Sequence, residues 1–268
     1  MRYPIKSLLL FILLLSGITA KSNNLPHHSK TKHREAIPVG AKKLIACYPD
    51  FISGFSDNHL IFKDKSTLLW DDGVKNKSFQ DLLDKPDLKD MFSQKYTTGK
   101  LKADPPRNFD PGRIRNEALF LKMYGETADK VKQNLTTITW CPNLVGKSIR
   151  VTKINGVDKQ LKQVSDELDK HPELQKYLAD IGGTFTWRVI HGTARHSTHS
   201  FGMTIDINTN DSDYWQWNCK CTNEDVQVDY KNKIPQIIVD IFERHGFIWG
   251  GKWYHYDTMH FEYRPELM

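Results

Sequence analysis

The chain contains few cysteines and, beyond its first twenty residues, no long hydrophobic run. No later segment has the roughly 20 consecutive apolar residues that a membrane-spanning helix needs, so the sequence argues against an integral membrane protein. We also see no internal repeat. The 268 residues include only four cysteines, which are Cys47, Cys141, Cys219 and Cys221.

Two common hydrolase signatures are also missing. The chain has no His-Glu-x-x-His sequence, which argues against a thermolysin-like zinc peptidase. It has no Gly-x-Ser-x-Gly sequence, so a serine hydrolase with a nucleophile elbow has little support. The net charge of +6 is dispersed along the sequence. Such a charge fits general surface basicity or an anionic polymer as partner, and it fits nucleic acid poorly.

The first twenty residues resemble an export signal. Arg2 and Lys6 form a basic start, residues 7–16 are rich in leucine, and residues 17–20 offer small residues for cleavage. We therefore expect an exported protein, periplasmic or extracellular, without stable membrane insertion once the signal is removed. An uncleaved membrane anchor is the alternative. Residues 21–43 are polar and basic without apolar periodicity, so we expect a disordered linker there.

An exported chain with four cysteines is expected to form disulfides. A Cys47–Cys141 bond would tie the N-terminal region to the middle of the chain, and a Cys219–Cys221 bond would close a very tight ring. The other pairings stay open, because sequence alone does not fix connectivity. Cys219 and Cys221 could also bind a metal, although no second cysteine pair completes a structural zinc site.

The patterning predicts an α+β domain. In residues 44–104, a strand/helix region of unknown role, the apolar stretches 44–55 and 60–70 favour a hairpin. Residues 105–268 form the main domain. Helices are expected near 113–124, 127–135, 159–168, 171–178 and 234–245, and strands near 147–154, 184–190, 202–208, 247–249 and 258–263. Helices followed by strands favour a small antiparallel sheet with flanking helices.

Two short segments near the C-terminus carry the chemistry. The first, residues 197–206, contains His199 and Asp206, and the second, residues 257–262, contains Asp257 and His260. Two imidazoles and one carboxylate are the ligand set of an open zinc site, which leaves the fourth position to water. That water needs a nearby base. The two segments together contain three candidate ligands and a candidate base.

Strand periodicity sorts these residues into roles. Around residue 206, Met203, Ile205 and Ile207 share one face of a strand, so Asp206 looks away from the core. His260 and Glu262 share a strand face, and Glu262 could therefore orient His260 from behind. Asp257 has the opposite parity and must lie in the turn before the strand. That position suits a base better than a metal ligand.

The motif formed by these two segments resembles that of a known protein family. Ser-x-His-x-x-Gly-x-x-x-Asp followed by Asp-x-x-His resembles the signature of the D-alanyl-D-alanine carboxypeptidase and L-alanyl-D-glutamate peptidase family of zinc metallopeptidases. This family shares its fold with the hedgehog signalling domain. The similarity covers about residues 185–267, including the stretches 187–195 and 250–253. Residues before 105 carry no assignable motif.

The resemblance implies a role for each matching residue. His199, Asp206 and His260 would be the zinc ligands. Asp257 would be the general base, at a position where many relatives have glutamate. Arg195 would bind substrate or stabilise the oxyanion, although the spacing from Gly192 differs slightly from the common form. Arg188 competes for the same role.

Other residues near the motif have less specific roles. Three further histidines lie near the motif: His191, His196 and His255. One of them could help to stabilise the oxyanion, and each could instead lie behind the metal ligands or be exposed to solvent. Trp249, Trp253 and Tyr254 could line a substrate groove or pack beneath the site, and Ser197 could orient the loop that contains His199.

The sequence thus predicts an exported zinc-dependent peptidase acting on peptidoglycan stem peptides. The resemblance implies either D-Ala-D-Ala carboxypeptidase activity or L-Ala-D-Glu type endopeptidase activity. The alternative is a non-catalytic, hedgehog-like zinc domain that binds cell-wall polymer. Asp257 disfavours this alternative, because a structural zinc needs no base.

Overall fold

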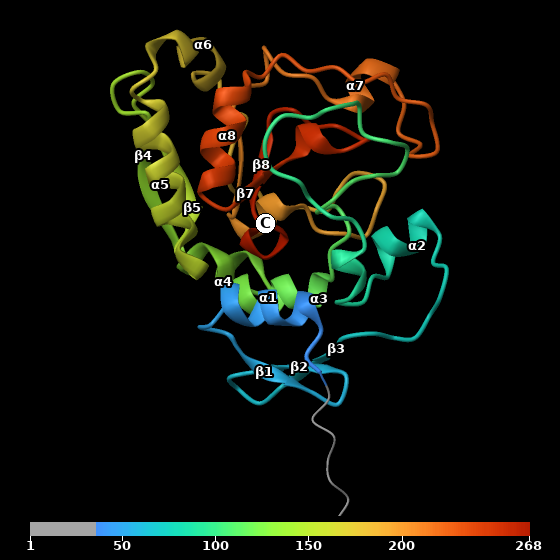
Figure 1. Cartoon of the computed structure of the whole chain (residues 1–268). Coiled ribbons are helices and arrows are strands. Elements are labelled where there is room, and N and C mark those ends of the chain that lie inside the picture. The colour runs from blue at the N-terminus through green and yellow to red at the C-terminus, as the bar shows by residue number, and fades with distance from the viewer. Residues whose placement is uncertain (1–35) are drawn as a thin grey trace, which may run out of the picture. The chain divides into compact units, whose positions relative to one another are not determined.

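A computed structural model describes residues 36–268 (Figure 1). The expected export signal at 1–20 and residues 21–35 of the expected linker lie outside the described residues. None of the helices within 36–268 combines the length and hydrophobicity needed to cross a bilayer. The observed mixture of helices and small antiparallel sheets confirms the expected α+β class.

The described chain begins with a helix where the sequence analysis expected linker and strand. Helix α1 (Val39–Cys47) buries Gly40, Ala41 and Leu44. The strand expected from residue 44 is therefore wrong over 44–47, because Leu44 continues the buried face of this helix at helical spacing. Gly40 fits here for a steric reason, since a Cβ would lie only 2.6 Å from the Phe92 ring.

The expected hairpin follows directly. Strands β1 (Ile52–Ser56), β2 (His59–Phe62) and β3 (Thr67–Leu69) form an antiparallel sheet in the order β1-β2-β3. Asp57 and Asn58 make the turn between β1 and β2 with φ values of 50° and 58°. Asp and Asn tolerate this left-handed conformation, which tight hairpin turns require. In Figure 1 this sheet lies below α1.

The middle of the chain is mainly helical, and polar side chains cap several of the helices. Ser78, Asn116 and Thr127 each accept a hydrogen bond from a backbone N–H of the first turn, which fixes where α2, α3 and α4 start. The helices are α2 (Phe79–Asp84), α3 (Glu117–Tyr124), α4 (Ala128–Gln133), α5 (Val157–Leu168) and α6 (Gln175–Leu178).

Two expectations for this region need correction. The helix expected over 127–135 ends at Gln133, because β4 (Leu135–Trp140) pairs with β5 (Lys147–Thr152) along its whole length. The strand expected over 184–190 is not formed. Its backbone bonds to the nearby loop instead, with the N–H of Thr186 donating to the carbonyl of His199 and the N–H of Ser197 donating to that of Arg188.

The C-terminal sheet brings together the two segments singled out in the sequence. Strands β6 (Thr204–Asp206), β7 (Phe247–Trp249) and β8 (His260–Tyr263) are antiparallel in the order β6-β8-β7. Asp206 and His260 are direct register partners. Their side chains therefore emerge on the same face of neighbouring strands.

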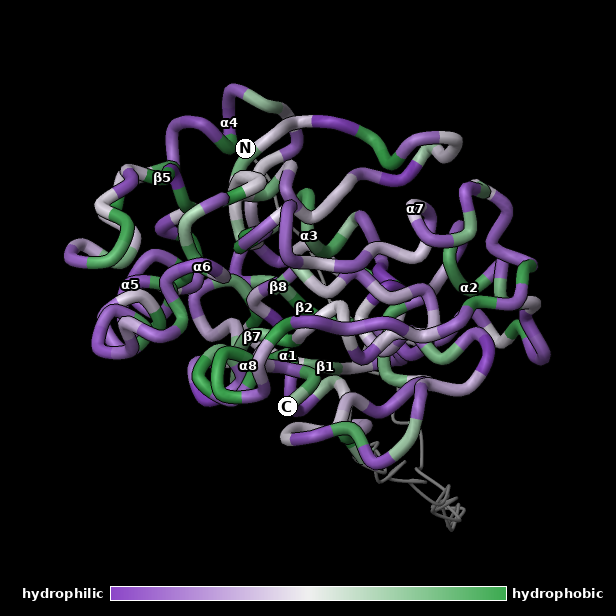
Figure 2. The backbone as a smooth tube through the Cα atoms, turned by 90° about the horizontal axis from the view of Figure 1, so that it is seen from above, coloured by the Kyte–Doolittle hydropathy of each residue, from purple (hydrophilic) through white to green (hydrophobic). Residues whose placement is uncertain are grey.

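Helix α8 (Gln236–Arg244) covers this sheet, and its apolar face is buried. In Figure 2 it is largely green, whereas many outlying loops are purple. One core cluster contains residues from Ala41 to Phe261, so residues on both sides of position 104 share it. The remaining helix, α7 (Trp215–Cys219), lies in the loop region before α8.

Phe242 of α8 provides a test of this packing. Its ring stacks on Phe261 of β8, with the centroids 3.9 Å apart, and it is fully buried. We expect Phe242→Ala to lower the free energy of unfolding by about 3–5 kcal/mol, because it leaves a cavity in the core. Urea denaturation measures this change. Ile237→Ala is the matched control on the same helix, since that side chain is 39% exposed. Equal losses for both variants would contradict the packing described.

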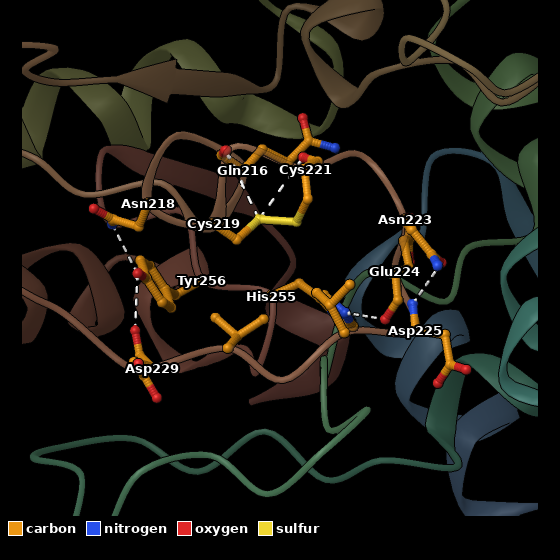
Figure 3. The surroundings of a disulfide bond; sticks show 12 residues. Gln216, Asn218, Cys219, Cys221, Asn223, Glu224, Asp225, Asp229, His255 and Tyr256 are labelled. Carbon is orange, nitrogen blue, oxygen red and sulfur yellow. Dashed lines mark hydrogen bonds between the residues drawn. A yellow bond between two sulfur atoms is a disulfide. The ribbon is translucent and has the colours of Figure 1, made fainter.

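The cysteines resolve into one disulfide and two free thiols. Cys219 and Cys221 are bonded, which leaves neither sulfur available as a metal ligand (Figure 3). Cys47 and Cys141 are not paired with each other. Burial raises the pKa of Cys141 to about 12, so this thiol stays protonated at neutral pH.

Candidate metal centre

The structure brings His199, Asp206 and His260 together, with one donor atom from each within 4.8 Å of the others. His199 Nε2 lies 3.1 Å from Asp206 Oδ2, and His260 Nδ1 lies 3.1 Å from Asp206 Oδ1. The carboxylate therefore stands between two ring nitrogens. Both imidazoles are buried, with 6% and 7% of each residue exposed.

Local structure explains how His199 reaches Asp206. A short 3-10 helix, Thr198–Phe201, carries His199 and ends at Gly202, which has a φ of +66°. A Cβ at residue 202 would lie 2.7 Å from a methyl carbon of Leu135, so glycine is needed there for both backbone and space. The chain turns at Gly202 and runs directly into β6, which ends at Asp206.

The outer nitrogen of each imidazole has an acceptor. His199 Nδ1 lies 3.3 Å from the carbonyl oxygen of Thr184, and His260 Nε2 lies 3.2 Å from Glu262 Oε2. A carbonyl and an ionised carboxylate only accept hydrogen bonds, so both outer nitrogens must donate. The other two ring nitrogens, His199 Nε2 and His260 Nδ1, face the Asp206 carboxylate and are the atoms that could bind a metal. In metal-binding histidines the outer nitrogen likewise donates to a neighbouring acceptor.

The Glu262 carboxylate is itself held firmly. It is fully buried, and Arg264 Nη1 donates to its Oε1 at 2.9 Å. Burial alone would raise the pKa of Glu262, but Arg115, His260 and Arg264 outweigh that effect and hold the pKa well below its usual range. Glu262 is therefore an ionised acceptor behind His260. The sequence placed Glu262 on the correct strand face for this contact.

Asp257 lies in the loop before β8, where its parity required it to be. Burial and the neighbouring Asp206 carboxylate raise the pKa of Asp257 to about 7. Its Oδ1 is buried and has no hydrogen-bond partner among residues 36–268. A buried carboxylate oxygen without a partner is rare, and this one stands close enough to the His/Asp cluster for their charges to interact.

This donor set fits a zinc ion. Two imidazole nitrogens and one carboxylate oxygen are ligands that zinc accepts, and three protein ligands leave one position open. The charges also favour a cation. Burial would lower the pKa of His260, but the carboxylates of Asp206 and Glu262, which accept hydrogen bonds from the ring, and the charges of Asp206 and Asp257 raise the pKa to about 10.

The other residues singled out in the sequence lie outside this cluster. His196 pairs with Glu117 at 2.7 Å, and buried His255 pairs with Asp110 at 2.6 Å. His191 is exposed. Trp253 packs beside His260, with ring centroids 5.5 Å apart, whereas Trp249 stacks on core Phe261. The Tyr254 hydroxyl donates to the carbonyl of Val226.

Arg195 is already neutralised by two carboxylates. Its Nε lies 3.2 Å from Asp84 Oδ1, and its Nη2 lies 3.4 Å from Glu224 Oε1. Arg188, the competitor, is exposed. Glu224 follows the disulfide loop, and its carbonyl oxygen accepts a hydrogen bond from His255 Nε2 at 2.9 Å (Figure 3).

Sequence reasoning missed two arginines beside the site. Arg113 pairs with Asp110 and Glu224, and Arg115 lies 3.7 Å from Glu262. Both were assigned to a helix, yet α3 begins only at Glu117. The alternation Arg113-Ile114-Arg115, with Ile114 buried, was the available signal that both arginines share one face of an extended segment.

A second group of carboxylates forms salt bridges with Lys77. Asp71, Asp72 and Asp87 approach one another closely enough to suggest a cation site. The buried ammonium of Lys77 lies 2.7 Å from Asp72 and 3.5 Å from Asp87. Lys77 therefore neutralises part of the charge of this cluster, and Lys89 pairs with Asp71 at 2.5 Å.

Residues 191–263 match the family model described as D-alanyl-D-alanine carboxypeptidase. This match confirms the family resemblance of the sequence over these residues. All four carboxylate and imidazole positions of the site fall within it. No curated protein and no solved structure matches the chain.

Proposed function

We propose that this protein is an exported zinc peptidase that hydrolyses peptide bonds in peptidoglycan stem peptides. The convergence of His199, Asp206 and His260, with Asp257 alongside, carries the proposal. The match of residues 191–263 to the carboxypeptidase family supports this substrate class. The leucine-rich start of the sequence supports export.

His199, Asp206 and His260 would hold the zinc ion. When bound, zinc would act as a Lewis acid that activates water and polarises the scissile carbonyl. The protein's own part is to orient the ligands, and the hydrogen bonds of His199 to Thr184 and of His260 to Glu262 do this.

Asp257 would move the proton. Its unpartnered Oδ1 accepts a proton from the attacking water. As the C–N bond breaks, the same carboxyl delivers this proton to the leaving amine, and the other product is a carboxylic acid. Arg195 would bind the substrate or stabilise charge on the carbonyl oxygen. For this, a substrate must compete with its contacts to Asp84 and Glu224.

The test is digestion of purified muropeptides, with products identified by mass spectrometry. We expect new peptide termini with zinc-loaded protein, loss of these products with a chelator, and recovery when zinc is added back. New termini would also name the bond that is cut. Cleavage that survives chelation would contradict the zinc mechanism. Absence of cleavage by zinc-loaded protein would favour the alternative of a wall-binding zinc domain.

A further inference from the structure

Helix α7 and the residue before it carry an aromatic pair at the surface. Trp217 is 54% exposed, and it is the only Trp, Tyr or Phe among the exposed large hydrophobic side chains of residues 36–268. Tyr214 precedes the helix, and its ring meets the Trp217 ring edge to face with the centroids 5.6 Å apart. A lone exposed apolar side chain needs no explanation. Two rings in contact, however, form a continuous aromatic surface.

This aromatic surface begins directly beside the proposed base. Tyr214 and Asp257 are partners in an isolated antiparallel bridge. The N–H groups of Trp215 and Thr258, one residue beyond each partner, donate to the opposite segment at 3.0 and 2.9 Å. These bonds flank the Tyr214–Asp257 pair without joining it. Residues in such a non-hydrogen-bonded pair have their side chains close together on one face.

The electrostatics of Tyr214 agrees with this placement. Burial, and next the charge of Asp257, raises the pKa of Tyr214 to about 12. The Tyr214 side chain therefore lies near the carboxylate of the proposed base. Trp217 packs against Tyr214 and is more exposed. The aromatic surface thus starts at the candidate active site and continues outward to solvent.

The backbone that carries Trp217 is restrained. Asn218 Nδ2 donates to the hydroxyl oxygen of Tyr256 at 2.7 Å, which ties the helix to the segment that contains the proposed base. The Cys219–Cys221 disulfide closes the chain two residues after Trp217 (Figure 3). An aromatic ring held on a restrained backbone loses little conformational entropy when it binds a ligand.

The chemistry of this surface fits a sugar ring. Residues 214–218 read Tyr-Trp-Gln-Trp-Asn and carry no charge at neutral pH, in a chain of which 26% is charged. A matching ligand is neutral, with a flat apolar face and polar groups at its edge. A pyranose ring has this form, because its C–H groups point to the ring faces while its hydroxyl and acetamido groups lie around the edge. Such C–H groups pack favourably on the electron-rich face of an aromatic ring.

We propose that Tyr214 and Trp217 form a subsite for an N-acetylated sugar ring of the glycan chain, with Trp217 as its platform. The proposal rests on the peptidase function proposed above, and it extends the substrate to a stem peptide still joined to its sugar. The stem peptide is linked through its first residue, L-alanine, to N-acetylmuramic acid. Because the subsite lies beside Asp257, it favours cleavage close to the sugar, at the L-Ala-D-Glu bond, over cleavage at the far end of the stem.

Binding of a sugar without any peptide tests the subsite itself. The probe is tetra-N-acetylchitotetraose, titrated into the purified protein with zinc added and followed by calorimetry. We expect binding that Trp217→Ala weakens by about 5–50-fold, because the variant removes the apolar area that the sugar covers. Trp217→Tyr keeps an aromatic face and should retain most of the affinity. Val74→Ala is the control, since that apolar side chain is 60% exposed.

Hydrolysis of two matched peptides tests the link between the subsite and the active site. Both contain L-alanyl-D-isoglutamine, and the N-terminus carries either N-acetylmuramic acid or only an acetyl group. We expect a lower KM for the sugar-linked peptide, and Trp217→Ala should remove this difference. The difference should appear in KM, because a sugar contact away from the reacting bond is made equally in the ground state and in the transition state.

Absence of sugar binding by the parent protein, or sugar binding that survives Trp217→Ala, would overturn the proposal. Sedimentation velocity examines a different occupant, a second copy of the chain. A dimer that dissociates in the Trp217→Ala variant would likewise overturn the proposal. Sugar binding that depends on Trp217, with no cleavage of either peptide, would support the subsite and count against the peptidase function at this bond.

Discussion

Replacing His260 with alanine is expected to remove stoichiometric zinc binding and muropeptide hydrolysis together. The variant loses one of three donors and leaves the carboxylates of Asp206 and Glu262 without their shared imidazole. Loss of an outer partner alone typically costs about 10–100-fold in metal affinity or activity, so loss of a ligand should exceed this range. Metal analysis of the purified protein and a hydrolysis assay measure the two effects.

His171→Ala is the control for this variant. His171 pairs with Glu173 at 3.0 Å, its side chain is 34% exposed, and it is not part of the His/Asp cluster. It should leave zinc content and hydrolysis unchanged. If the His260 variant kept one zinc per chain, the ion would have to bind elsewhere and the proposed centre would be wrong.

Asp257→Asn should separate the two roles at the site, because it removes a base without removing a ligand. We expect kcat to fall by about 10²–10⁴, the usual contribution of general acid–base catalysis. Zinc content should not change, since the three donor atoms lie on His199, Asp206 and His260. Asparagine has nearly the same shape as aspartate, so the buried position is preserved.

Asp257→Glu is the matched conservative variant. It keeps a carboxyl group and should retain measurable hydrolysis, with a loss that reflects its longer side chain. An asparagine variant as active as the parent would show that Asp257 is not the base. Loss of zinc in the same variant would instead make Asp257 a ligand.

Much of the site could be predicted because its residues follow strict local patterns. The alternation of strand residues gave the outward direction of Asp206 and the pairing of His260 with Glu262. The same parity placed Asp257 in the preceding turn. These predictions need only the two-residue period of a strand, which a sequence shows directly.

Two strand predictions were wrong because the same residues take part in other structure. Residues 44–47 are apolar enough for a strand, but they complete a helix whose Gly40 and Ala41 pack into the core. Residues 184–190 alternate like a strand, yet their backbone groups bond to the loop that carries His199. Short apolar segments are ambiguous in this way until their partners are known.

The sequence by itself was enough to predict the α+β class, the resemblance to the carboxypeptidase family and the candidate metal-binding residues. Only the tertiary structure decided which carboxylate pairs with which arginine. Arg113, Arg115 and Arg195 look alike in sequence, and their partners Asp110, Glu224, Asp84 and Glu262 come from distant parts of the chain. Charge balance depends on distances between groups that folding brings together, and residue order does not contain those distances.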